Sequence, residues 1–383
     1  MLELDQEIGL RLVLKIKKIT LIILQPTRGT WEPVGPRQAI VLNQLIDQVT
    51  QKNLQSCCQN EIDVVYTWVN GSDPEFQTSL KNEIALWGKN NVSGDAAIAA
   101  RFYDWNTMRY SIRSVEKFAP FARNLYIVTN GHAPHWLNTT NPKVHLVTHA
   151  EIFPNKSHLP TFNSKAIEHH LYRIKGLSDK FLYFNDDMFL SNNISRDVLL
   201  YGNSGQWIFT DFKVKDCYPG CRIDRTNNGK CNLACNNTFC NFDGYDCVFK
   251  NKQITKMSLE QSKPSSGTWM TSRAFTNGIL SEKFGIAKRY DISHAPYFLD
   301  KHIMDDYTKA FAKYIDETSA SKFRKPCNVA LPMAYFNFIM GMSDQGQLHD
   351  EQGRYRFKTR SGYGERFVEF VGINRYGLNS SEI

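Results

Sequence analysis

The sequence of 383 residues lacks, near its start, an apolar run long enough to cross a bilayer. The longest uninterrupted apolar stretch there covers residues 19–24, whereas a spanning helix needs about 20 residues. Lys15, Lys17 and Lys18 precede it, and a charge near the bilayer centre costs about 2.5–3.5 kcal/mol. Residues 10–24 therefore indicate a weak signal-peptide core, an amphipathic helix or an incomplete start, with no evident membrane anchor.

The chain also has only a small excess of one charge over the other. The chain has 46 basic and 38 acidic residues, a net charge of +8, and no basic cluster. This excludes nucleic acid as the expected partner and suits anionic substrates such as phosphates. Apolar residues make up 42% of the chain and charged residues 22%, which excludes a disordered chain. Internal repeats are missing, and the length suffices for a sizeable core.

Cysteines are present but unevenly placed. Six of the nine lie between Cys217 and Cys247, and the others are Cys57, Cys58 and Cys327. Six cysteines in so short a segment indicate a disulfide or metal module inserted in a larger fold. The cysteines favour the secretory pathway, where disulfides persist, as do six glycosylation sequons besides the formal one at residues 70–72. The sequons begin at Asn91, Asn138, Asn155, Asn193, Asn236 and Asn379.

Acidic and amide side chains are interleaved with these cysteines. Asp224, Asn228, Asp243 and Asp246 can supply oxygen ligands for Ca²⁺. Zinc bound by thiolates is the rival, but cysteines with acidic residues between them favour disulfides plus calcium. The module cysteines are Cys217, Cys221, Cys231, Cys235, Cys240 and Cys247.

Strand and helix patterns alternate in the first half of the chain. This order predicts an α/β fold with a mostly parallel sheet, whose ligands bind beyond the carboxyl ends of the strands. The predicted strands are 62–69, 124–129, 143–148 and 180–184. The predicted helices are 39–51, 74–88, 104–118, 164–175 (capped by Ser164), 296–315 and 330–342.

These patterns divide the chain into a core interrupted by the cysteine module. The expected parts are an N-terminal segment with a possible anchor remnant and linker (1–60), the first part of the core (61–215), the cysteine module (216–248), a linker (249–284), the last part of the core (285–342) and a polar tail (343–383).

Asp186 and Asp187 directly follow the predicted strand 180–184. Two carboxylates at a strand end can hold a divalent metal on a nucleotide diphosphate, because Mg²⁺ takes one or two carboxylates plus phosphate oxygens. Such a metal neutralises charge on a leaving phosphate. The alternative is a capping or turn pair, which is common after strands.

Several other side chains are candidates for phosphate, base or proton contacts. His294 can act as a general base, although a lone histidine is often structural. The aromatic rings near residue 68 can stack on a nucleobase or pack in the core. Arginines can clamp phosphates or lie on the surface. The nucleoside candidates are Tyr66, Thr67, Trp68 and Asn70, and the arginines are Arg109, Arg113, Arg289 and Arg324.

These residues resemble a known family. Residues 62–73 (IDVVYTWVNGSD) resemble the first conserved region of Stealth proteins, and 216–246 is similar to a Lin-12/Notch repeat. RYSIRS from Arg109, IVTNG from Ile127, SHLPTF from Ser157 and FNDD from Phe184 resemble the second region. His294-Ala-Pro and Lys322-Phe-Arg324 resemble the third. Stealth regions with an inserted Notch repeat are characteristic of lysosomal-enzyme N-acetylglucosamine-1-phosphotransferases.

The resemblance implies a Rossmann-like nucleotide-sugar transferase core. Members of the family that these residues resemble transfer N-acetylglucosamine 1-phosphate from UDP-N-acetylglucosamine to the 6-hydroxyl of mannose on lysosomal glycoproteins, at the Golgi membrane. It implies Mg²⁺ or Mn²⁺ at the active site, Ca²⁺ in the repeat, and a gamma subunit and a homodimer partner. The implied roles are metal ligands for Asp186 and Asp187, catalytic base for His294, phosphate contacts for Arg109 and Arg324, and donor contacts for Tyr66 to Asp73.

Two alternatives remain open. The first is an inactive transferase fold that serves as a calcium-dependent lumenal binding protein, because no fourth Stealth region is recognisable after residue 342. The second is a bacterial-type Stealth enzyme that builds phosphodiester-linked glycans, against which the Notch-type repeat argues. Only one such repeat is present, and the spacer between the first two regions is short, residues 74–100.

Overall fold

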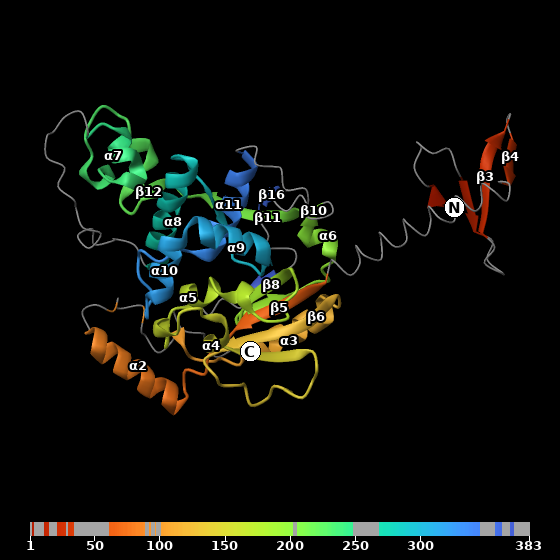
Figure 1. Ribbon diagram of the computed structural model, residues 1–383, viewed down its shortest axis with the longest axis horizontal. Helices are drawn as coiled ribbons and strands as arrows, with labels where there is room; N and C mark the ends of the chain where they lie inside the picture. Colours follow the sequence, from red (N-terminus) through yellow and green to blue (C-terminus); the bar gives the residue numbers. More distant parts are fainter. Residues whose placement is uncertain are drawn as a thin grey trace, which may run out of the picture. The chain divides into compact units, whose positions relative to one another are not determined.

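The computed structural model describes residues 61–88, 92, 96, 101–201, 205–247, 268–344, 357–361 and 368–370, together with four strands before residue 34. Two compact units, Met1–Asn60 and Glu61–Ile383, divide the chain. Figure 1 shows the elements coloured along the sequence. The helix predicted over 39–51, as well as Cys57 and Cys58, lies outside the described residues.

The first unit contains an antiparallel sheet of strands β1 (Leu2–Glu3), β2 (Arg11–Leu14), β3 (Leu21–Thr27) and β4 (Thr30–Pro33), in that order. The amphipathic helix considered for residues 10–24 is therefore wrong where the structure describes the segment. Its β-branched and leucine-rich stretch pairs with neighbouring strands instead. Among the described residues, no helix is long and apolar enough to cross a membrane.

A five-stranded sheet lies at the centre of the second unit, in the order β15-β8-β5-β6-β7. Strands β5 to β8 run parallel to their neighbours, and β15 is antiparallel to β8. The mostly parallel α/β fold predicted from the sequence is confirmed. The strands are β5 (Ile62–Thr67), β6 (Ala122–Thr129), β7 (Val144–Thr148), β8 (Lys180–Asn185) and β15 (Tyr297–Asp300).

Burial explains why β5 and β8 hold the centre. Both are continuous apolar and aromatic runs, as expected for parallel strands covered on both faces. Lys180, at the start of β8, is one buried exception. Asp63 of β5 is another. Its carboxylate accepts hydrogen bonds from Arg123 on β6 (Nε to Oδ1, 2.8 Å) and from the backbone of Ser178 (2.7 Å). These bonds tie β5 to its neighbours at the edge of the sheet opposite the carboxyl ends.

Helices cover this sheet. Figure 1 shows α8, α9, α10 and α11 gathered on one side of β5, β6 and β8. The helices are α2 (Pro74–Trp87), α3 (Thr107–Phe118), α4 (His149–Ile152), α5 (Ser164–Glu168), α6 (Arg196–Leu199), α8 (Thr268–Phe284), α9 (Lys301–Ala310), α10 (Ala312–Ala320) and α11 (Leu331–Asp344). Short 3-10 turns η3 (Lys156–His158) and η4 (Leu171–Arg173) flank α5.

A second sheet is built from β10 (Leu200–Tyr201), β11 (Gly205–Lys213), β14 (Tyr290–Ile292) and β16 (Phe357–Ser361). Strand β9 (Met188–Leu190) pairs with β17 (Val368–Phe370). The predicted tail 343–383 thus returns to the body through β16, which runs parallel to β11, and through β17. Its polar composition concealed these two short strands.

Three predictions about elements are corrected. The helix predicted over 296–315 begins only at Lys301, because Tyr297–Asp300 is fully buried and pairs with β8. The carboxylate of Asp300 caps the helix by accepting from the backbone of His302 (2.9 Å). The helix predicted over 164–175 breaks into α5 and η4. Its N-cap is Asn163 rather than Ser164.

The expected linker 249–284 is helical from Thr268 to Phe284. Its pattern was missed because buried polar residues interrupt the apolar face. Ser272 donates to the carbonyl of Asn328, and Asn277 donates to the carbonyl of Asp216 (2.7 Å). These bonds satisfy polar groups that would otherwise oppose burial of the helix.

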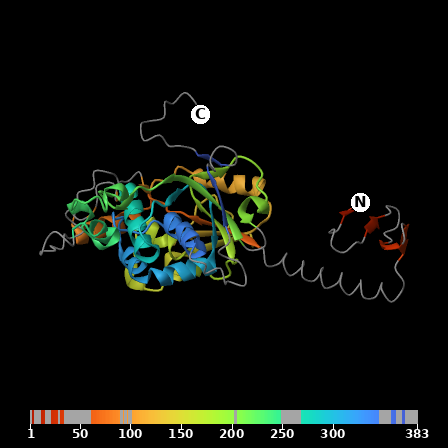
Figure 2. The same cartoon turned by 90° about the horizontal axis from the view of Figure 1, so that it is seen from above.

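The cysteine module follows β11. Its elements are β12 (Asp216–Tyr218), β13 (Cys221–Arg222), η5 (Ile223–Arg225), η6 (Leu233–Cys235), η7 (Thr238–Cys240) and α7 (Asn241–Gly244). The module lies beside α8 in both views (Figures 1 and 2). Phe239 stacks on Tyr218 and meets Phe275 of α8 edge-on. A side chain at Gly278 would lie 2.9 Å from the carbonyl oxygen of Cys217, so α8 needs glycine at this contact.

Candidate functional site

A cavity of about 760 Å³ opens at the carboxyl ends of the central strands. Thr67 and Trp68 line it from the end of β5, and Asn130 from the end of β6. Asp186 and Asp187 line it from the turn after β8. This is where ligands bind in open α/β sheets, and the volume is typical of a small-molecule site.

The acidic pair lies in an environment that favours a cation. Burial, together with the charges of Asp187 and Asp104, raises the pKa of Asp186 to about 7. One carboxylate oxygen of Asp187, Oδ1, is buried and has no hydrogen-bond partner among the described residues. An orphaned carboxylate oxygen beside a second carboxylate that resists ionisation fits Mg²⁺.

The pair does not form part of a cluster of three ligating side chains among the described residues. A cation bound here would therefore take its other ligands from substrate oxygens and water, as Mg²⁺ commonly does. Asp104 was missed by the sequence analysis. It accepts hydrogen bonds from the indole of Trp68 (3.1 Å) and the backbone of Asn106 (2.7 Å), so it orients the aromatic side chain at this end of the cavity.

His294 lies between β14 and β15 and faces the same cavity. Asn185 Nδ2 lies 3.4 Å from its Nε2. Asn185 in turn accepts from the hydroxyl of Tyr183 (2.9 Å), whose oxygen lies 3.1 Å from Thr67 Oγ1. The surrounding protein lowers the pKa of His294, and the charge of Asp187 raises it. The lowered pKa favours the neutral imidazole, which is the form that can accept a proton.

The cavity lining also includes cationic groups and a third carboxylate. Arg324 Nη2 donates to the hydroxyl of Ser164 (2.7 Å), and Lys165 and Glu168 come from the same short helix, α5. Burial raises the pKa of Glu168, and the charges of Arg324 and Lys165 lower it. Both α5 residues were missed, because nothing in the sequence separates them from ordinary helix residues.

Other predicted donor residues lie away from the cavity lining. Tyr66 is fully buried, its hydroxyl 2.6 Å from Ser111 Oγ, and burial raises its pKa. Asp73 caps α2 by accepting from the backbone of Phe76 (2.8 Å). Asn70 accepts from the backbone of Ser72 (3.1 Å), which fixes the turn after β5.

The remaining candidate arginines also lie outside the lining. Arg109 and Arg113 are exposed on α3. Arg289 is buried and donates to Asn277 (3.0 Å) and Ser281 (2.9 Å), so it holds the C-terminal half of α8. Of the predicted arginines, only Arg324 lines the cavity. Arg101, which was not predicted, lines it as well.

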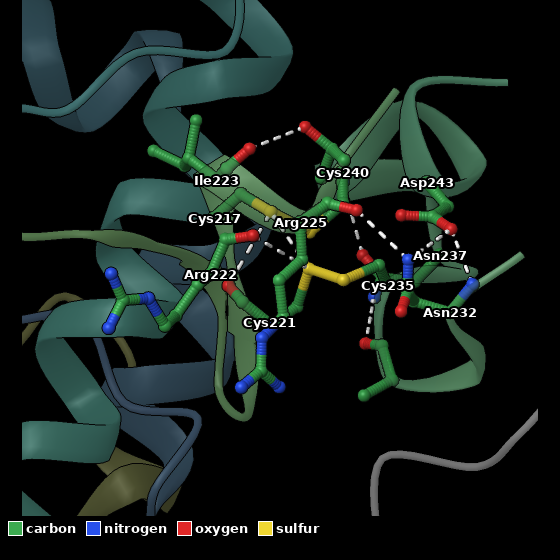
Figure 3. Close-up of a disulfide and its surroundings, with 12 residues drawn as sticks. Cys217, Cys221, Arg222, Ile223, Arg225, Asn232, Cys235, Asn237, Cys240 and Asp243 are labelled. Carbon is green, nitrogen blue, oxygen red and sulfur yellow. Dashed lines mark hydrogen bonds between the residues drawn. A yellow bond between two sulfur atoms is a disulfide. The ribbon is translucent and has the colours of Figure 1, made fainter. Parts of the chain in front are cut away.

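In the module, all six cysteines form disulfides, namely Cys217–Cys240, Cys221–Cys235 and Cys231–Cys247. Figure 3 shows the first two, with Asp243 beside Asn232. Because these sulfurs are bonded to one another, they are not zinc ligands, and the zinc alternative is wrong. Cys327 is a free thiol.

Three of the four predicted calcium ligands form one hydrogen-bonded group. Asp246 Oδ2 accepts from the backbone of Asn228 (2.7 Å), and Asn228 Oδ1 accepts from Asn232 Nδ2 (3.3 Å), which also reaches Asp243 Oδ2 (3.1 Å). Asp243 Oδ1 is buried with no hydrogen-bond partner among the described residues, which fits a cation. Asn232 belongs to the group and was missed.

Asp224, the fourth predicted ligand, is engaged elsewhere. Arg222 donates to both of its oxygens, at 3.0 and 2.5 Å. The same hydrogen bonds lower the pKa of this carboxyl group. Asp224 is therefore held in an ion pair with Arg222, whereas Asp243 and Asp246 belong to the hydrogen-bonded group that could bind calcium.

The fold and the cavity define a class: an α/β protein with an acid-lined, histidine-bearing cavity at a strand-end site suited to phosphorylated ligands. The comparisons name the family. Residues 60–82, 101–207 and 293–341 match conserved regions 1, 2 and 3 of Stealth proteins, and residues 214–248 match an LNR domain. The chain is a Stealth-family protein with an LNR domain, the Notch-type repeat, between its second and third regions. LNR domains typically bind Ca²⁺, in agreement with the orphaned oxygen of Asp243.

Named relatives come from animals and bacteria. The chain is 48% identical over 166 residues to the mouse "N-acetylglucosamine-1-phosphotransferase subunits alpha/beta", covering 42% of this chain and 13% of that protein. It is 32% identical over 278 residues to an exopolysaccharide phosphotransferase of Streptomyces coelicolor, covering 72% and 39%. It is 38% identical over 181 residues to a capsular polysaccharide phosphotransferase of Haemophilus influenzae, covering 45% and 47%. Each match spans less than half of the relative's length.

Proposed function

We propose that this chain transfers a sugar 1-phosphate from a nucleotide diphosphate sugar to a hydroxyl acceptor. The observation that carries the proposal is the single cavity at the strand ends that Asp186, Asp187, His294 and Arg324 all line. It provides carboxylates for a divalent cation, a neutral imidazole and a guanidinium within one space large enough for such a donor. The phosphotransferase names of the relatives support the same reaction class.

In the proposed reaction, the oxygen of the acceptor hydroxyl bonds to the phosphorus that carries the sugar. The bond from this phosphorus to the oxygen bridging the two phosphates breaks, and the nucleoside monophosphate leaves with that oxygen. His294 accepts the proton of the hydroxyl, and Asn185 holds the ring by its 3.4 Å contact with Nε2. Arg324 contacts phosphate oxygens. A divalent cation held by Asp186 and Asp187 would neutralise charge on the phosphates.

The finer proposal concerns the substrates. We infer UDP-N-acetylglucosamine as donor and the 6-hydroxyl of mannose on high-mannose glycans of lysosomal enzymes as acceptor, with release of UMP, the first step of mannose 6-phosphate tagging. The 48% identity with the mouse protein and the presence of an LNR domain support this choice. Three disulfides fit the lumen of the secretory pathway, and we place the protein on the lumenal side of the Golgi membrane. A gamma subunit and a second copy of the chain are the proposed partners.

A second acceptor class has support of its own. The Streptomyces exopolysaccharide phosphotransferase aligns with 72% of this chain, more than the mouse protein does. A polysaccharide hydroxyl is therefore the alternative acceptor, with the same donor chemistry. A third reading, an inactive calcium-dependent binding protein, predicts that no UMP is released.

The experiment is a transfer assay with labelled UDP-N-acetylglucosamine, with and without a chelator. A simple mannoside, a folded lysosomal glycoprotein and a bacterial exopolysaccharide serve as acceptors. We expect Asp187→Asn to lower the rate by about 10²- to 10³-fold, the size of a lost electrostatic group at an active site. The matched control, Asp197→Asn, changes an exposed carboxylate and keeps the wild-type rate.

Each contrary result removes a different part of the proposal. A wild-type rate in Asp187→Asn with Mg²⁺ present rules out the metal assignment. An unchanged rate in His294→Ala removes the histidine as base. The absence of UMP release with every acceptor would favour the binding-protein reading.

A further inference from the structure

Lys165 is a buried cation in the cavity wall. Only 2% of the residue is exposed, yet it lines the cavity with Arg324 and Glu168. Its ammonium nitrogen lies 5.4 Å from the centre of the Trp269 ring, and the indole of this exposed residue lines the same cavity. A cation over an aromatic face is held in place by the ring quadrupole.

Two cationic side chains and one carboxylate lie together in this wall. Glu168 is the carboxylate that faces both Arg324 and Lys165, and burial raises its pKa. One carboxylate that is costly to ionise thus serves two cations. Because Lys165 and Arg324 both line the cavity, an anionic ligand there can contact two cationic side chains.

The charges of the whole cavity lining also favour an anionic ligand. Three cationic side chains, Arg101, Lys165 and Arg324, stand against three carboxylates, Glu168, Asp186 and Asp187. A divalent cation at the acidic pair would leave the lining with about two positive charges. A nucleotide diphosphate sugar carries about two negative charges on its phosphates, which matches this excess.

We propose that Lys165 contacts the diphosphate of the donor, as a second cation beside Arg324, with the Trp269 ring holding its ammonium in the wall. This rests on the proposed function for the identity of the ligand, a nucleoside diphosphate. Lys165 was not among the candidates from the sequence, because a lysine in a helix is ordinarily exposed.

The test is calorimetric binding of UDP in the presence of Mg²⁺, with uridine as the probe that lacks phosphate. Lys165→Gln weakens UDP binding about tenfold or more, and uridine binding stays unchanged. Lys165→Met, which keeps the aliphatic packing, is the second variant and shows the same loss. Lys175→Gln changes an exposed lysine and serves as the matched control, with wild-type affinity for UDP.

The outcomes separate this inference from the proposed function. UDP binding that depends on Lys165 in a protein that transfers no sugar phosphate supports the anion site and rejects the activity. Active transfer with wild-type UDP affinity in both folded Lys165 variants overturns the inference and leaves the activity standing. Equal losses for UDP and uridine overturn it too, because they show a general distortion of the cavity.

Discussion

The α/β core and the LNR module are stabilised in different ways. The core buries whole apolar strands, and Phe181 of β8 is fully buried. The interior of the module consists mainly of cysteines, and three disulfides close loops within residues 217–247. A segment this short buries too little apolar surface to fold without cross-links or an ion. We therefore expect the core and the module to respond to different perturbations, although the module packs against α8 of the core.

The largest expected effect comes from the core. Phe181→Ala removes a fully buried ring and lowers the free energy of unfolding by about 3–5 kcal/mol. Denaturant unfolding measures it. Leu86→Ala, at an exposed position on α2, is the control and changes stability by less than about 0.5 kcal/mol. Equal effects of the two substitutions would contradict the assigned core.

Removing a bridge affects the module next. Replacing Cys221 and Cys235 together by serine costs about 2–5 kcal/mol in that segment. Hydrogen exchange should increase across the module while β5 stays protected. Cys327→Ser, which removes a free thiol, leaves both regions unchanged. Loss of protection in β5 of the double variant would show that the core depends on the bridge.

Calcium removal tests the ligand assignment within the module. At a calcium concentration about 100 times Kd, binding stabilises the module by about 2.7 kcal/mol. We expect chelation to raise hydrogen exchange in residues 216–247. Asp243→Asn reproduces the effect, because its buried Oδ1 is the proposed ligand, and Asp224→Asn does not, because Arg222 engages that carboxylate. If Asp224→Asn raised hydrogen exchange and Asp243→Asn did not, Asp224 would be the calcium ligand and Asp243 would not.

Buried histidines make the core sensitive to mild acid, whereas residues 216–247 contain no histidine. Burial lowers the pKa values of His169 and His170 to about 3 and of His149 to about 4. The unfolded chain therefore binds more protons, so stability is full above about pH 6.5 and falls as the pH drops toward the folded values. Each histidine contributes a slope of about 1.4 kcal/mol per pH unit in this window.

The test of this slope is His170→Gln, which keeps a polar group for its contact with Ser319 (2.7 Å). Unfolding measured between pH 5 and 7 should show a shallower dependence in the variant. His135→Gln, at an exposed position, keeps the wild-type slope. A wild-type slope in both variants would mean that His170 is not a source of the acid sensitivity.

The sequence predicted the parallel sheet because its strands are long apolar runs that end in turn residues. It predicted the strand-end position of Asp186 and Asp187 for the same reason. It missed α8, whose buried Ser272 and Asn277 hide the apolar face, and it assigned β15 to a helix, since a short apolar run carries no period of its own.

The cavity wall was predicted only in part. Arg324 came from a motif, but Lys165 and Glu168 carry no local signal and reach the cavity only through packing of α5. Tyr66 shows the opposite error. It was predicted to contact the donor because it lies in a motif near a strand end, but its hydroxyl points into the core and lies beside Ser111. Which side of a buried strand a residue faces depends on the sheet neighbours, and these are set by residues far away in the chain.

The most direct test of the central claim uses UDP-N-acetylglucosamine labelled with ³²P on the phosphorus bonded to the sugar. Sugar-phosphate transfer moves this label to the acceptor and releases unlabelled UMP, and Asp187→Asn suppresses both. Label recovered in UDP would instead show transfer of the sugar alone, and label that stays in the intact donor would contradict the proposed transfer.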